Sequence, residues 1–165
     1  MNSPDYLVKV SENKSNLLIG ALLELLNGVA YLGIAVLVYP IFKKFNESLA
    51  LFYLGFRIIE FSMQLISDMS PLLLITASQN FITANTQDTS SFQAVGSILL
   101  AQRFWANQMV FLNYSLGAFI FYYLTYHLRL IPRFLSIWGL IGPPLVLVNV
   151  VFDSCALNVG VDLGL

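Results

Sequence analysis

The stretch LGFRIIEFSMQLISD, Leu54–Asp68, places four polar side chains within an otherwise apolar segment. These side chains are Arg57, Glu60, Gln64 and Asp68, at i, i+3, i+7 and i+11, and this spacing aligns them on one face of an α-helix. An ion that faces lipid at a helix centre costs about 2.5–3.5 kcal/mol. We therefore predict that this face points into a bundle of membrane-spanning helices.

The composition of the whole chain supports a membrane protein. Of its 165 residues, 58% are hydrophobic and 10% are charged, and the mean hydropathy is +0.76. Soluble domains carry about 25% charged residues. With a formal net charge of −1 and scattered Lys and Arg, the chain has no basic surface for nucleic acid. The expected partner is the lipid bilayer, and nucleic acid is excluded.

Four apolar runs are long enough to cross a bilayer, which takes about 20 residues in a helix. None shows the period-two alternation of a strand. The sequence predicts an all-α polytopic transmembrane helical bundle with spans at about 17–39, 48–75, 96–126 and 134–155. This bundle would occupy residues 16–155, between an external segment 1–15 and a short tail 156–165.

Local signals predict where the helices begin, bend and end. Ser15 or Asn16 can cap the first helix, and Pro40 is expected to close it just after Tyr39. Proline removes a backbone donor, so Pro71 predicts a kink or stop in the second span and Gly142–Pro144 a kink in the fourth.

Basic residues predict the orientation, because short loops rich in Lys and Arg stay on the cytoplasmic side. Residues 43–44 mark one such turn, and Arg129 and Arg133 mark another. The polar tract 76–93 contains Asp88 and no basic residue, so it is expected to form an outer surface loop. The protein should therefore lie in the cell membrane as a multipass protein, with both basic turns inside.

Several polar residues should meet within the bundle. Arg57 and Glu60 lie roughly 13 and 18 Å in from the inner end of their span, and polar stripes on the first and third spans reach similar depths. The predicted polar cluster consists of Glu24, Asn27, Arg57, Glu60, Gln64, Arg103 and Asn107. Arg57 would pair with Glu60 or Glu24, and Arg103 with whichever acid remains.

This cluster is compatible with two functions. It could be a structural clamp that fixes how the helices pack, as interhelical polar contacts do in membranes. Alternatively, it could serve a small transport, ion-relay or proton-relay protein, using Glu24, Arg57 and Glu60. A clamp should be dry and fully paired, whereas a transport site should be wet and open. With a single histidine, His127, and a single cysteine, Cys155, no ordinary zinc site, cofactor site or catalytic motif is apparent.

Three stretches carry a family resemblance: GALLELLNGVA (20–30), YPIFKKFNESLALFYLGFRIIE (39–60) and RLIPRFLSIWGLIG (129–142). They resemble the bacterial integral membrane proteins grouped as domain of unknown function 4386, and PDYLVKVSENKS (4–15) is similar to that family's external loop. The resemblance implies membrane residence and no known activity. It places the recurring polar positions of the family at Glu24, Asn46, Glu47, Arg57, Glu60, Pro132, Arg133 and Trp138.

Members of that family are generally longer, so this chain is expected to correspond to their central four helices. Absent flanking helices would leave the outer faces of the first and fourth spans free, including Gly20, Gly28 and 139–142. These faces favour a homo-oligomer or pairing with the flanking helices of a longer protein.

The orientation can be tested by labelling introduced cysteines with an impermeant thiol reagent on intact cells. In a Cys155→Ser background, we expect Asp88→Cys to be labelled and Lys44→Cys to be spared, because the basic turn should be cytoplasmic. Permeabilised cells, in which both sites should react, provide the control. Labelling of Lys44→Cys alone would invert the orientation.

Overall fold

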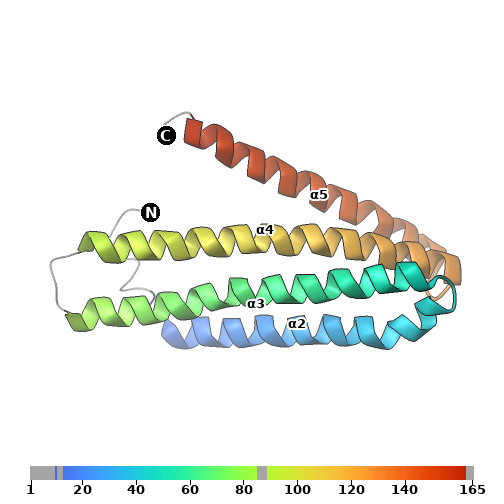
Figure 1. Ribbon diagram of the computed structural model, residues 1–165, viewed down its shortest axis with the longest axis horizontal. Helices are drawn as coiled ribbons and strands as arrows, with labels where there is room; N and C mark the ends of the chain where they lie inside the picture. The colour runs from blue at the N-terminus through green and yellow to red at the C-terminus, as the bar shows by residue number, and fades with distance from the viewer. Residues whose placement is uncertain (1–9, 11–12, 85–88, 163–165) are drawn as a thin grey trace. The chain divides into compact units, whose positions relative to one another are not determined.

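The computed structural model describes residues 10, 13–84 and 89–162, and four long helices account for nearly all of them (Figure 1). The helices are α2 (Lys14–Lys43), α3 (Glu47–Ala84), α4 (Thr89–Leu128) and α5 (Arg133–Asp162). No strand occurs among these residues. The predicted all-α fold with four spans is therefore confirmed, and each helix contains one of the expected apolar runs.

All four helices are long and apolar enough to cross a membrane. The candidate spans are Lys14–Lys43, Glu47–Asn80, Ser91–Leu128 and Arg133–Cys155. Large apolar side chains cover their outer faces; Leu37 is 76% exposed and Phe152 is 72% exposed. An apolar surface this extensive is unfavourable in water and suited to lipid. The helices are thus those of a membrane protein.

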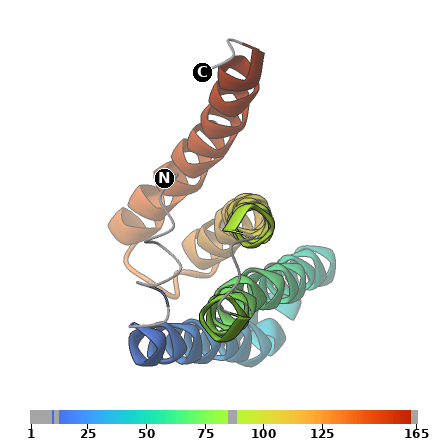
Figure 2. The ribbon, with the colours of Figure 1, turned by 90° about the vertical axis from the view of Figure 1, so that its left-hand side faces the viewer.

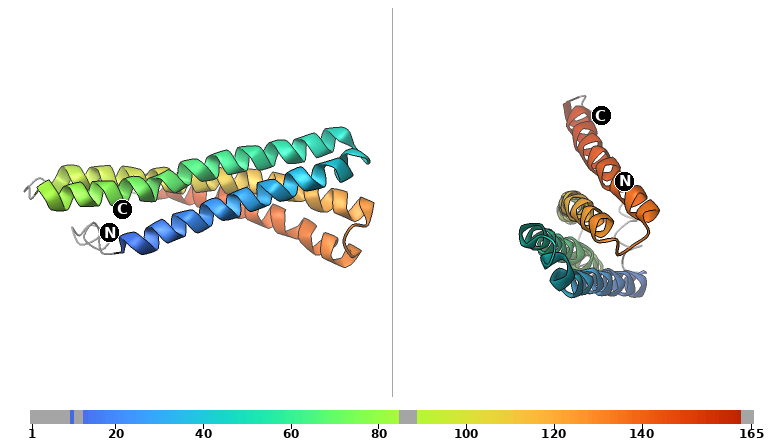
Figure 3. Two further views of the ribbon diagram at one scale, coloured as in Figure 1. Left: turned by 90° about the horizontal axis from the view of Figure 1, so that it is seen from below. Right: turned by 90° about the vertical axis from the view of Figure 1, so that its right-hand side faces the viewer.

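Contacts divide the chain into two units, each built from parts of α2, α3 and α4. The first unit comprises the described part of 1–30 together with 62–107, and the second comprises 31–61 and the described part of 108–165. Within each unit, the segments of α2, α3 and α4 lie side by side (Figure 3). The second unit also contains α5, which follows the end of α4 after a short turn (Figure 2).

The second unit has an aromatic core near the turn between α2 and α3. The ring of Phe42 contacts Tyr53 and Phe121 edge-on, at centroid distances of 5.5 and 5.8 Å. Its fully or nearly fully buried members are Ala35, Phe42, Ala50, Tyr53 and Leu124. These contacts hold the adjoining ends of α2, α3 and α4 together.

Specific hydrogen bonds at the helix ends define both turns of the second unit. Asn46 caps α3, because its Oδ1 accepts a hydrogen bond from the backbone N–H of Leu49 at 3.0 Å. At the end of α4, Arg129 has a left-handed φ of 53°, and the N–H of Leu130 donates to the carbonyl of Thr125 at 3.3 Å. This arrangement is a Schellman-type helix end.

Several boundary predictions were wrong. The first helix starts at Lys14, which places both proposed caps inside it, and it continues through Pro40. Pro71 lies inside α3 and does not stop it. Pro143 and Pro144 lie inside α5, and the kinks expected at these prolines stay predictions. Proline removes only one backbone donor, and the remaining ladder can keep a membrane helix intact.

The polar tract 76–93 is also mostly helical rather than a loop. It completes α3 and begins α4, while Asp88 lies outside the described residues. The backbone hydrogen bonds of a helix form within the segment itself and so do not require apolar side chains. The hydroxyl of Thr76 donates to the carbonyl of Leu72 at 3.2 Å, so a polar side chain can be satisfied locally.

Gly139 brings α5 close to α4 in the second unit. A Cβ at this position would overlap the ring of Tyr122. Gly139 is therefore part of an internal contact, and the expectation that it belongs to a free outer face was wrong for this residue.

We expect Gly139→Ala to destabilise the chain by about 1–3 kcal/mol, since overpacking displaces neighbouring groups. Thermal unfolding in detergent would measure the effect. The matched control is Gly33→Ala in α2, where a Cβ meets nothing within 4 Å; this change should be neutral or slightly stabilising. Equal stability of the two variants would contradict the close packing at Gly139.

Candidate functional site

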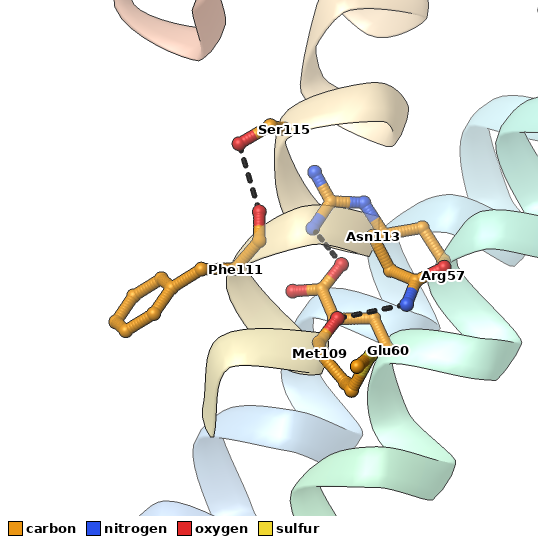
Figure 4. Close-up of polar contacts among 6 residues, drawn as sticks. All are labelled: Arg57, Glu60, Met109, Phe111, Asn113 and Ser115. Carbon is orange, nitrogen blue, oxygen red and sulfur yellow. Dashed lines mark hydrogen bonds and ion pairs between the residues drawn. The ribbon is translucent and has the colours of Figure 1, made fainter. Parts of the chain in front are cut away.

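The most deeply buried ion pair joins Arg57 and Glu60 of α3, in the second unit. Nη1 of Arg57 donates to Oε2 of Glu60 at 2.8 Å, and the two side chains are only 10% and 4% exposed. Figure 4 shows both residues directed from α3 towards α4. The i, i+3 spacing lets one helix supply both charges, so the pair is neutral before any other helix packs on it.

Three tyrosine rings surround the guanidinium of Arg57. Its Cζ lies 5.6 Å from the ring centre of Tyr31, 5.5 Å from that of Tyr53 and 5.5 Å from that of Tyr114. These distances are within the range of cation–π attraction. The rings belong to α2, α3 and α4 respectively, so Arg57 makes favourable contacts with all three helices. We refer to Arg57, Glu60 and these three tyrosines as the arginine site.

Small and polar residues of α4 lie close to the arginine side chain. A Cβ on Gly117 would lie 3.7 Å from Nε of Arg57. Nearby, the amide of Asn113 donates to the carbonyl of Met109, and the hydroxyl of Ser115 donates to that of Phe111, each at 2.8 Å (Figure 4). These two polar side chains bind carbonyls of their own helix, and Arg57 forms its ion pair with Glu60.

A small cavity adjoins the arginine site. Its volume is about 150 Å³. Its lining consists of Tyr31, Ile34, Tyr53, Arg57, Tyr114, Ala118, Phe121 and Tyr122. The cavity is thus mainly aromatic, with a single cationic side chain.

The first unit contains a separate group of polar contacts. Nη2 of Arg103 on α4 donates to Oε1 of Glu24 on α2 at 2.8 Å, with side chains 32% and 39% exposed. Further contacts link Gln64 to Asp68 at 2.8 Å and Ser67 to Asn107 at 2.9 Å. Together these contacts connect all three helices of the unit.

The structure settles the pairings that the sequence left open: Arg57 pairs with Glu60, and Arg103 pairs with Glu24. One predicted cluster member, Asn27, is instead exposed. The i, i+3 spacing places Glu24 and Asn27 on the same side of α2, but it does not determine how much of that side the neighbouring helices cover.

The predicted cluster left out the three tyrosines of the arginine site and one further buried polar residue. Tyr53 precedes Arg57 by one helical turn, and this i, i+4 spacing is the signal that could have identified it. Asp68 was recognised on the polar face but left out of the cluster, although it is only 6% exposed. Among the described residues, no three His, Cys, Asp or Glu side chains form a group that could hold a metal ion.

Comparison with known proteins identifies one family. A sequence model described as "Domain of unknown function (DUF4386)" matches residues 1–162. No curated protein matches significantly, and no solved structure does so.

The contribution of the aromatic rings can be measured at Tyr114. Tyr114→Leu should lower stability by about 0.5–2 kcal/mol, because the attraction between Arg57 and the ring is lost. Tyr114→Phe is the control, since it keeps the ring and should remain close to wild type. Thermal or denaturant unfolding in detergent would compare the stabilities of the two variants. If both lost the same stability, the effect would come from the hydroxyl and not from the ring.

Proposed function

Because the chain belongs to the family described as Domain of unknown function (DUF4386), we propose its role from the geometry of its polar sites. We propose a multipass integral membrane protein of the bacterial cell membrane with a structural or interaction role. In this role, the arginine site acts as a polar clamp that joins parts of α2, α3 and α4.

One observation carries this proposal: Arg57 is 8% exposed and has its counterion on the same helix. A buried charge is stable only when it is paired, and Glu60 provides that pairing at 2.8 Å. The three rings then add contacts from α2, α3 and α4. A buried charge that is paired within its own helix and contacted by rings from neighbouring helices supports a clamp.

The alternative is a small transport, ion-relay or proton-relay protein. The cavity of about 150 Å³ beside Arg57 favours it, since a solute or water needs space next to the charged group. Against it, Glu24 pairs with Arg103 rather than with Arg57. A relay through Glu24, Arg57 and Glu60 therefore lacks the contact that would connect its members.

The interaction role would involve a second copy of the chain or flanking helices. An exposed stripe on α5 supports this role, because its members recur at alternating steps of four and three, the spacing of a helix–helix seam. They are Phe134, Trp138, Ile141, Leu145, Val148 and Phe152, each between 56% and 72% exposed. The lipid bilayer covers the remaining apolar faces.

The clamp can be tested with a double-mutant cycle. Glu60→Leu leaves the Arg57 cation without its partner, and breaking a buried pair costs about 3–5 kcal/mol. Adding Arg57→Leu should recover most of that loss, because no charge then remains buried. Unfolding in detergent and the yield of folded protein are the measurements.

The exposed pair of Lys43 and Glu47 provides the matched control. Its atoms are also close, at 2.9 Å, but the side chains are 50% and 59% exposed. The same cycle there should give a coupling of about 0–1 kcal/mol. A double variant at Arg57 and Glu60 that is as unstable as Glu60→Leu alone would refute the clamp.

A further inference from the structure

The first unit contains two neighbouring carboxyl groups, each with one buried oxygen that has no donor. Asp68 on α3 borders a cavity that is also lined by Ala21 and Leu25 of α2, which flank Glu24, and Glu24 is close enough to act on the Asp68 carboxyl group. Oε2 of Glu24 and Oδ2 of Asp68 are both buried and accept no hydrogen bond from any described residue. Asp68 is 6% exposed, so bulk water does not supply the missing donor.

The other oxygen of each carboxyl group is already satisfied. Oε1 of Glu24 accepts from Arg103 on α4 at 2.8 Å, and Oδ1 of Asp68 accepts from Gln64 at 2.8 Å. The charged groups here are thus two acids and one base, drawn from all three helices of the unit. With both acids ionised, the group would carry one excess negative charge.

The surroundings make that excess charge unfavourable. Asp68 borders a cavity of about 480 Å³ whose other lining residues are apolar, among them Leu22, Leu25, Leu65 and Leu72. An isolated charge is strongly disfavoured in such a medium, and two carboxylates that share a site cannot both remain ionised easily. The arginine site differs, because Arg57 and Glu60 balance each other.

We propose that Glu24 and Asp68 bind one proton between them. A proton on either buried oxygen creates the missing donor, satisfies both buried atoms at once and makes the group of Glu24, Asp68 and Arg103 neutral. The chain therefore has a proton-binding site whose residues are separate from those of the arginine site.

Infrared spectroscopy of the full chain in lipid nanodiscs tests this proposal. We expect a carbonyl stretching band from a protonated carboxylic acid that shifts in D₂O. Asp68→Asn and Glu24→Gln should each abolish it, because an amide supplies the donor and the remaining acid is balanced by Arg103. Two variants are used so that a folding failure in one leaves the other informative.

Two further variants sharpen the result. Arg103→Gln removes the balancing cation, so both acids should bind protons and the band should increase about twofold. Glu47→Gln is the control, because Glu47 is exposed and paired with Lys43; the band should not change. Absence of the band in wild type, or its persistence in both amide variants, would overturn the proposal. Loss of the band on adding sodium would also overturn it, by indicating a sodium ion instead.

Discussion

The neutralisation of charge in an apolar medium is the constraint on which this structure depends. Arg57 cannot discharge as a carboxylic acid can, so its burial requires a permanent partner. Glu60 supplies that partner within the same helix, at 2.8 Å. The ion pair can therefore form together with α3, before neighbouring helices associate. The neighbouring helices add cation–π contacts: Tyr31 of α2 and Tyr114 of α4 lie beside the guanidinium of Arg57 and help to fix its position.

The same constraint has a different outcome in the first unit. Arg103 balances only one of the two acids, Glu24 and Asp68, that interact with each other. A balanced pair such as Arg57 and Glu60 should keep its protonation state, because protonating Glu60 would leave the charge of Arg57 buried without a partner. An unbalanced group favours the binding of a cation, and the smallest cation is a proton. On the polar face of α3, Arg57 and Glu60 thus stabilise the fold, whereas Asp68 is the residue proposed to bind a proton.

The sequence predicts the fold well because apolar length and helical spacing are local properties. It also predicts that Arg57 and Glu60 are buried, since a lipid-facing position would be costly for each. Helix boundaries were less predictable: α2 continues through Pro40, because one missing donor does not outweigh the rest of the ladder. The exposure of Asn27 and the burial of Asp68 depend on how neighbouring helices are rotated, and a single helix does not encode that rotation.

The choice of partner was the least predictable feature, for an energetic reason. Arg57 could have neutralised either Glu60 or Glu24, and charge alone does not distinguish them. Pairing with Glu60 orders groups that one helix already holds close together, whereas pairing with Glu24 requires another helix to supply the acid. The local pair is the one that forms, which leaves Glu24 available to Arg103 and Asp68. The grouping of Glu24 with Arg103 and Asp68 therefore follows from the smaller entropy cost of pairing Arg57 with Glu60.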